Sequence, residues 1–151
     1  MAAQHHFYRY VLNPLMRGLL RSPLHGLASG NIGILHFTGR HSGQAFDTPL
    51  SFMREDSTVR LLSAPTTRWW MNFRDAEAPV EMEIAGQRHP GRARLFEGDS
   101  EALREGVRRF IAAVPRDAPI YKLKLDAQKK VTEESLAARA SELILVEVAL
   151  D

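Results

Sequence analysis

Residues 37–52 read FTGRHSGQAFDTPLSF, a polar turn placed between two apolar segments. The segment before it, IGILHFTG (32–39), is a short apolar run rich in residues that favour β-strands. The segment after it, TPLSFM (48–53), alternates apolar and polar residues, as a half-buried strand does. We therefore predict two strands on either side of a tight turn that holds Gly39 and Gly43.

The rest of the chain adds strands and a few helices to this pair. Further strands are predicted for TVRLLSA (58–64), PVEMEIAG (79–86), QRHPGRARLFEG (87–98) and ELILVEVAL (142–150). Helices are predicted for TTRWWMNFRD (66–75) with Thr66 or Thr67 as cap, DSEALREGVRRFIAAV (99–114) with Asp99 or Ser100 as cap, and TEESLAARA (132–140). Because the elements do not alternate as βαβ units, we predict an α+β, mainly antiparallel barrel with peripheral helices.

A chain of 151 residues fits a single domain, 1–151. Within it, residues 1–28 are expected to form an N-terminal helical extension, since apolar residues recur at helical spacing from Phe7 to Leu20. This segment either covers the core or, as a basic amphipathic helix, touches anionic lipid.

The chain has no cysteine, which excludes a disulfide framework, a thiolate zinc site and a thiol nucleophile. It also has no signal-peptide pattern and no apolar run of the roughly 20 residues that span a bilayer. We expect a cytoplasmic protein, with membrane association through the N-terminal segment as the alternative.

Charge is unevenly distributed along the chain. Residues 1–54 contain five Arg and one Asp, a balance of +4, whereas residues 55–151 contain 15 basic and 17 acidic side chains, a balance of −2. The first third is therefore where an anion is expected to bind.

The chemistry of the turn agrees with this expectation. Glycines let the backbone N–H groups approach an anion, and Arg40, Ser42 and Gln44 add side-chain donors. The spacing matches neither a P-loop nor a dinucleotide fingerprint. From the residues alone, a plain polar hairpin and an anion site remain open.

Other residues narrow the possible chemistry. Adjacent Trp69 and Trp70 point in different directions on a helix, so we expect one in the core and the other near a surface or pocket. The six histidines lack ligand spacing, Ser42 lacks a nucleophile-elbow context, and Glu81 and Glu83 are expected to face solvent from a strand. Neither a metal site nor a side-chain general acid–base pair is predicted.

Taken together, ILHFTGRHSGQAFDTPLSF (34–52), RWWMNF (68–73) and APVEMEIAGQRHPGRARL (78–95) resemble the deazaflavin-dependent nitroreductase family, also described as F420H2-dependent quinone reductases. The resemblance implies a split β-barrel of about six strands and a possible homodimer. It implies hydride transfer from reduced coenzyme F420 to a small-molecule acceptor such as a quinone or nitro compound, with the cofactor supplying the redox chemistry.

The resemblance also assigns residues. The tail anions of the coenzyme would be held at the turn, the ring would lie along the following strand, and the Trp segment would complete the wall. The residues implied for cofactor binding are Arg40, His41, Ser42, Gly43, Gln44, Thr48, Pro49, Leu50, Ser63, Ala64, Arg68, Trp69, Trp70 and Asn72. Arg68 stands in for a lysine that the family carries in a longer glycine-rich loop, and Tyr121 is the candidate catalytic proton donor. The alternatives are FMN as the cofactor, or a non-catalytic carrier of flavin, deazaflavin or haem.

Overall fold

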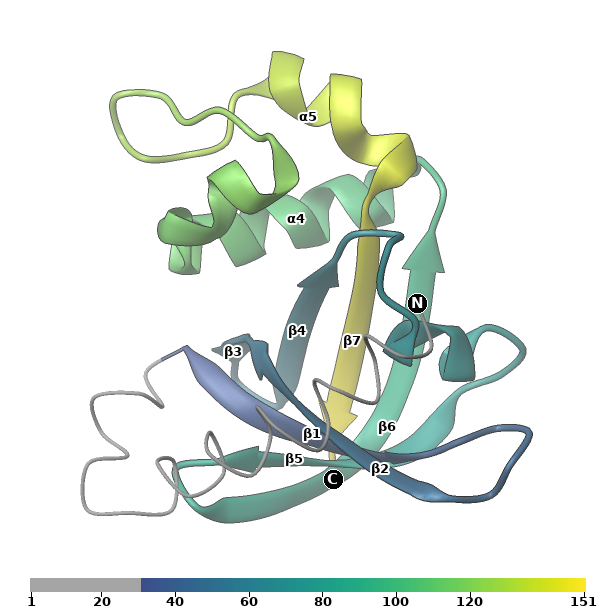
Figure 1. The fold of residues 1–151 in the computed structure, drawn as a ribbon. Coiled ribbons are helices and arrows are strands. Elements are labelled where there is room, and N and C mark those ends of the chain that lie inside the picture. The colour runs from purple at the N-terminus through teal and green to yellow at the C-terminus, as the bar shows by residue number, and fades with distance from the viewer. Residues whose placement is uncertain (1–30) are drawn as a thin grey trace.

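The computed structural model describes residues 31–151, so the predicted helical extension over residues 1–28 lies outside the described part. The described chain forms one seven-stranded antiparallel sheet that curls into a half-barrel, with helices gathered at one end (Figure 1). The strand order is β2-β1-β5-β6-β7-β4-β3. The predicted α+β split-barrel fold is confirmed.

The strands follow the predicted segments closely, with one addition. They are β1 (Ile32–Thr38), β2 (Ala45–Ser51), β3 (Met53–Glu55), β4 (Thr58–Ser63), β5 (Ala78–Ile84), β6 (Gln87–Glu97) and β7 (Ile144–Leu150). The predicted strand 48–53 is divided between β2 and β3, and Phe52, which belongs to neither, donates its N–H to the Asn31 carbonyl at 2.7 Å. β3 then pairs with β4 across a turn in which Asp56 has a φ of 57°. The count is therefore seven strands where about six were expected.

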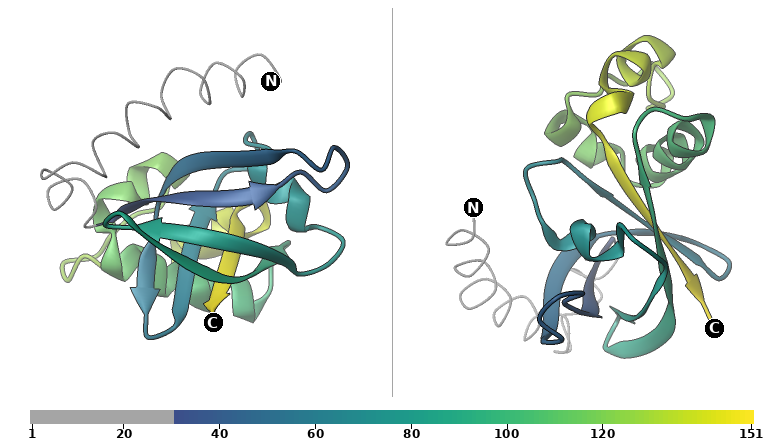
Figure 2. Two further views of the ribbon diagram at one scale, coloured as in Figure 1. Left: turned by 90° about the horizontal axis from the view of Figure 1, so that it is seen from below. Right: turned by 90° about the vertical axis from the view of Figure 1, so that its right-hand side faces the viewer.

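Two hydrophobic clusters make up the core. The barrel cluster contains Leu35, Phe37, Val80 and Val146 together with both tryptophans and Phe73. The helical cluster lies between the helices and the far end of the sheet and contains Val107, Phe110, Leu136 and Tyr121. The right-hand view in Figure 2 shows the helices at one end of the curled sheet, and in the left-hand view, seen from below, they lie behind the strands.

The helices begin where the sequence provides caps. Helix α4 (Glu101–Ala113) starts after Ser100, whose Oγ accepts a hydrogen bond from the Leu103 N–H at 3.1 Å, and its apolar stripe is fully buried. Helix α5 (Glu133–Arg139) starts after Thr132 in the same way. The short 3₁₀ helices η3 (Pro115–Tyr121) and η4 (Ala140–Glu142) complete this layer. The predicted helices over 99–114 and 132–140 are confirmed.

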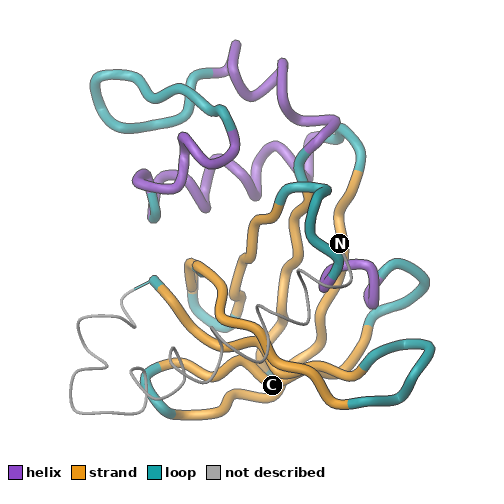
Figure 3. The backbone as a smooth tube through the Cα atoms, viewed as in Figure 1, coloured by secondary structure: helices purple, strands orange, loops and turns teal. Residues whose placement is uncertain are grey.

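The tryptophan segment forms a single short 3₁₀ helix, η2 (Trp69–Phe73), which lies beside the barrel and away from the helical layer (Figure 3). Its N-cap is Arg68 and no side chain caps it, so the predicted cap at Thr66 or Thr67 is wrong. The Thr67 hydroxyl instead donates to the Ala64 carbonyl at 3.1 Å, which stabilises the preceding turn.

Candidate functional site

The turn between β1 and β2 is closed by its own backbone. The Gly39 N–H donates to the Gln44 carbonyl at 2.8 Å, and the Gly43 N–H donates to the Gly39 carbonyl at 2.9 Å. Gly43 has a φ of 69°, and a Cβ on Gly39 would lie 2.6 Å from the Ser42 Oγ. Both glycines are therefore required for this compact shape.

Asn72 fastens this turn to η2. Its Oδ1 accepts the Arg40 N–H at 3.0 Å, and its Nδ2 donates to the Trp69 carbonyl at 3.0 Å. Residues that lie about thirty positions apart in the sequence are thereby joined by one amide side chain. The turn and the Trp segment therefore lie side by side.

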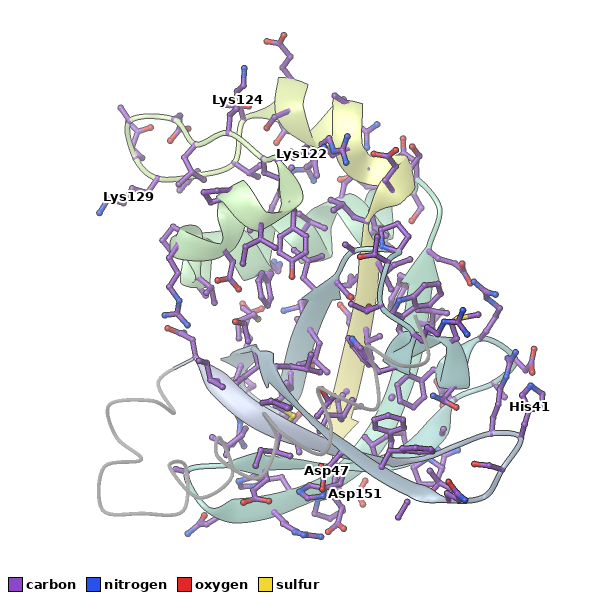
Figure 4. The ribbon with its side chains drawn as sticks, viewed as in Figure 1. His41, Asp47, Lys122, Lys124, Lys129 and Asp151 are labelled. Atoms are coloured by element: carbon purple, nitrogen blue, oxygen red, sulfur yellow. The ribbon has the colours of Figure 1, made fainter. Side chains whose placement is uncertain are left out.

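A cavity of about 210 Å³ lies between the turn and η2. It is lined by Phe37, Gly39, His41, Ser42, Phe46, Arg68, Trp69 and Asn72. Figure 4 shows His41 at the tip of the β1–β2 hairpin, on the outer side of this site. The cavity is smaller than the roughly 300–1,000 Å³ of pockets that enclose whole ligands, so it fits one end of a larger molecule.

The arginine side chains around the cavity are only partly available to bind an anion. Arg40 donates through Nη1 to the Asp75 carboxylate at 2.8 Å and through Nε to the His41 Nε2 at 3.1 Å. No residue in the described range 31–151 pairs with the guanidinium of Arg68, so Arg68 is the cation that is free to meet an anion.

Both tryptophan side chains are buried at 4% exposure, so neither lies at the open surface, and Trp69 is the one that lies beside a pocket. The short 3₁₀ helix lies against the open side of the barrel, where Trp69 contacts Phe73 edge-on at 6.4 Å between ring centres and Arg74 stacks over Trp70 at 5.0 Å. Neither indole N–H meets an acceptor within residues 31–151. A buried donor without a partner costs about 1–3 kcal/mol, and of the two residues only Trp69 lines the cavity.

Several residues implied for the site lie outside this cavity. Thr48 and Ser63 are buried. Pro49 and Leu50 belong to β2, and Ala64 packs against the helical cluster. The Ser63 hydroxyl bonds to Thr67 and Ala64 and so shapes the turn that leads to Arg68. Gln44 closes the hairpin turn through its backbone and does not line the cavity.

Tyr121 lies in the helical cluster and not among the turn residues. Its hydroxyl donates to the Leu62 carbonyl at 2.8 Å, and burial raises its pKa above the usual tyrosine value. The structure thus places the group in the core, and its role as a proton donor stays a prediction.

The sequence reasoning missed a buried polar pair. The expectation that Glu83 faces solvent is wrong: it is 1% exposed, and its Oε1 lies 2.7 Å from the His36 Nε2. Alternation places Glu81 and Glu83 on one face of β5, and the β1–β5 pairing sets His36 opposite Glu81, from where its ring reaches the Glu83 carboxylate. His36, together with Glu81, Arg88 and Arg92, lines a second groove of about 660 Å³ on the barrel.

Some site types are absent from the described residues. Across residues 31–151, no three histidine or acidic side chains converge in a way that suits a metal ion. In the same part of the chain, no helix is both long enough and apolar enough to cross a bilayer.

Fold and site together define a split-barrel protein that presents a glycine-containing turn beside a buried aromatic segment. The model of the F420H(2)-dependent quinone reductase family matches residues 21–133. The chain belongs to this family and is accordingly an F420H2-dependent reductase. A search of curated proteins gives no match.

Solved structures agree on the fold. An F420-H2 dependent reductase, FDR-A, is similar with a TM-score of 0.55 and 16% identity over 78% of this chain and 93% of that one. A structure described as a domain-swapped dimer has a TM-score of 0.55 and 18% identity over 92% and 96%. A pyridoxinephosphate oxidase family protein from Clostridium acetobutylicum has a TM-score of 0.54 and 10% identity over 88% and 84%.

Proposed function

We propose that this protein transfers a hydride from reduced coenzyme F420 to a quinone, nitro compound or other unsaturated small molecule. The observation that carries the proposal is the cavity beside the turn, where an unpaired Arg68 and the partnerless indole of Trp69 meet the glycine turn. These are donors without acceptors, as an anion-binding site requires before its ligand binds.

The bound coenzyme would supply the hydride, and the residues of this chain would bind and orient it. Arg68 would hold an anionic group of the tail, helped by the turn and by Ser42. Asn72 keeps the turn and η2 at a fixed separation through its two hydrogen bonds. Thr48, Pro49 and Leu50 would face the ring along β2. Buried tryptophans behind the cavity would keep water away from the bound group.

The test is a titration of the purified protein with F420, followed by the intrinsic fluorescence of the coenzyme. We expect saturable binding at micromolar concentration, and oxidation of the reduced coenzyme when menadione is added. Binding without turnover on any quinone or nitro acceptor would identify a carrier. Absence of binding would refute the proposal.

FMN is a second candidate ligand, and one observation favours it. The site offers one unpaired cation, Arg68, which suits a single phosphate as well as it suits a longer anionic tail. The structural relatives include a pyridoxinephosphate oxidase family protein. Competition decides between the two: FMN that displaces F420 at comparable concentration would make flavin the ligand, whereas no displacement by excess FMN supports F420.

We also propose a homodimer in the cytoplasm, since one similar structure is described as a domain-swapped dimer. Light scattering on the eluting protein should give twice the mass of the 17.0 kDa chain. A monomer at tens of micromolar would refute the dimer and leave the reductase proposal unaffected.

A further inference from the structure

The position of η2 has to be set by its surroundings, because the helix is too short to hold itself in place. It has five residues, Trp69–Phe73, and no side chain caps its N-terminus. Hydrogen-bond geometry in 3₁₀ helices is poorer than in α-helices, and helices of this length are not stable without tertiary contacts. The contacts made by η2 therefore decide how Arg68 and Trp69 meet the cavity.

The contacts described so far fix η2 only in part. The rings of Trp69 and Phe73 are buried in the barrel cluster, but hydrophobic burial is non-directional and does not by itself define an orientation. The contacts of Asn72 and Asp75 with Arg40 attach this segment to the β1–β2 turn. Both lie on the side of the turn, so a contact with another element is needed to define how the helix is oriented.

Arg74 makes that contact. It follows η2 as the C-cap residue, and its N–H donates to the Met71 carbonyl at 3.3 Å. Its guanidinium lies over the Trp70 ring, 5.0 Å from the ring centre. The same group donates twice to the Glu97 carboxylate, from Nε at 2.9 Å and from Nη2 at 3.1 Å. Glu97 is the last residue of β6, so the end of η2 is joined to the sheet. We call Trp70, Arg74 and Glu97 the arginine brace.

The brace differs from the other arginine contacts of the structure. In the described part of the chain, Arg74 is the only arginine that both stacks on an aromatic ring and forms a bidentate pair with a carboxylate. Arg94 lies over the Phe96 ring at 5.0 Å but donates to no carboxylate of that part. Arg104 forms a bidentate pair with Asp99, at 2.8 and 2.7 Å, but stacks on no ring there. The guanidinium of Arg74 is therefore fixed both in its plane and along its normal.

The brace is too exposed to contribute much to stability. The Arg74 and Glu97 side chains are 39% and 38% exposed, and an exposed ion pair adds little to folding and is screened by salt. Orientation is different, because groups that bind a ligand must be held within about 0.5 Å of their productive geometry. A planar guanidinium that is held by two hydrogen bonds and a ring restricts its neighbours in this way.

We propose that Arg74 is a positioning residue, which through the arginine brace holds η2 so that Arg68 and Trp69 meet an anionic ligand in the cavity. Arg74 does not itself line the cavity, so it acts through η2 and not on the ligand. The inference rests on the proposed function, since it concerns the same cavity. It predicts an effect opposite in sign to that of charge alone. Loss of the Glu97 carboxylate strengthens the binding of an anion by electrostatics, whereas release of the brace weakens it.

The experiment is a titration with F420, followed by the fluorescence of the coenzyme, for the wild type, Glu97→Ala and Arg74→Lys. Glu97→Ala should raise the Kd by roughly threefold to tenfold, because the ion pair and the fixed stacking are both lost. Arg74→Lys keeps the positive charge but has no planar fork, so we expect a similar loss. Binding by Glu97→Ala that equals or exceeds that of the wild type would overturn the proposal, as would wild-type affinity in Arg74→Lys.

The matched control is Asp99→Ala, which breaks the bidentate pair with Arg104 and removes a carboxylate close to Glu97 in the sequence. It should bind F420 as the wild type does and show the same small change in melting temperature as Glu97→Ala. An equal rise of the Kd in the control would mean that surface charge or stability, and not the brace, governs binding, and it would overturn the proposal.

Tryptophan fluorescence gives a second readout that needs no ligand. Trp69 and Trp70 are the only tryptophans of the chain, so their emission reports on η2 alone. Quenching by acrylamide should increase in Glu97→Ala and Arg74→Lys, because Arg74 no longer covers the Trp70 ring, and should stay unchanged in Asp99→Ala. A wild type that does not bind F420 would refute the proposed function, and quenching would then decide the brace. Unchanged quenching in both variants would overturn it, whereas increased quenching would support it as the contact that fixes η2.

Discussion

Asp75 competes with any bound anion for Arg40. The carboxylate takes the Nη1 of Arg40 at 2.8 Å, and the side chains are 75% and 26% exposed, respectively. Asp75→Asn removes this competitor and also removes a negative charge near the cavity. We therefore expect the variant to bind F420 more tightly than the wild type.

The magnitude follows from the exposure of the pair. An exposed ion pair is worth about 0.2–1 kcal/mol, so releasing Arg40 makes at most about a fivefold difference in Kd. Removing a unit charge at about 8 Å from an anion adds about 0.5 kcal/mol in water before screening by salt. Together these effects predict a Kd that falls roughly twofold to tenfold.

Fluorescence titration at low and high salt measures this change. Glu77→Gln is the matched control, because it removes a nearby exposed carboxylate that pairs with Arg92 at 3.7 Å and leaves Arg40 alone. The excess of the Asp75→Asn effect over the control reports the release of Arg40, and it should vanish in an Arg40→Ala background. Weaker binding by Asp75→Asn would refute the reasoning, since it would mean that Asp75 positions Arg40 for the ligand. A wild type that does not bind F420 at all would instead refute the proposed function.

Other substitutions separate the roles of the remaining residues. Arg68→Ala should raise the Kd for F420 by roughly ten- to a hundredfold because it removes the unpaired cation. Arg40→Ala should have a smaller effect in the same titration. The reverse order would contradict the assignment of Arg68 as the main anion-binding cation. Gly39→Ala should weaken the binding of F420 and lower the melting temperature, because the new Cβ would lie 2.6 Å from the Ser42 Oγ. Gly98→Ala is the control for stability alone, since Gly98 has a positive φ and open space around it. Tyr121→Phe should destabilise the fold by about 1–2 kcal/mol, since the Leu62 carbonyl loses its donor. The kcat should change little, whereas a fall of roughly a hundredfold in kcat would establish the tyrosine as a general acid. The hydrogen bond from Arg60 and the charge of Arg109 hold the pKa of Glu55 below its usual value, so the stability from these contacts is present above the ordinary carboxylate pKa and is lost as pH falls through the lowered one. Glu55→Gln should therefore flatten the fall of the melting temperature at acid pH. An unchanged fall would argue against a stabilising role of these contacts.

The sequence predicted the fold well where local patterns are strong. Alternation in 79–98 and the apolar stripe of 99–114 identified β5, β6 and α4, because each pattern is repeated over several residues. β3 was missed because a three-residue strand is too short to show a period. Its existence depends on pairing with β4, which the chain achieves through the left-handed Asp56.

The sequence predicted that the turn and the Trp segment lie together, but not the ion pairs around the turn. Family resemblance placed the turn and the Trp segment together, and the hydrogen bonds of Asn72 explain how they meet. It gave no sign that Arg40 is already paired, because Asp75 lies 35 positions away in the sequence and only the folded chain brings the two together. The buried Glu83 was missed for the same reason, since its partner His36 comes from another strand.

This difference changes how the turn works. In the sequence, Arg40 and His41 look like the principal anion-binding groups. In the structure Arg40 is paired with Asp75 and also donates to the His41 Nε2, so its charge is already balanced by a carboxylate. Arg68, at the start of η2, is the group that leaves the cavity positive. Because η2 also carries the partnerless indoles, we expect the short loop before Arg68 to contribute more to the selectivity of the proposed anion site than the glycine turn that first indicated it.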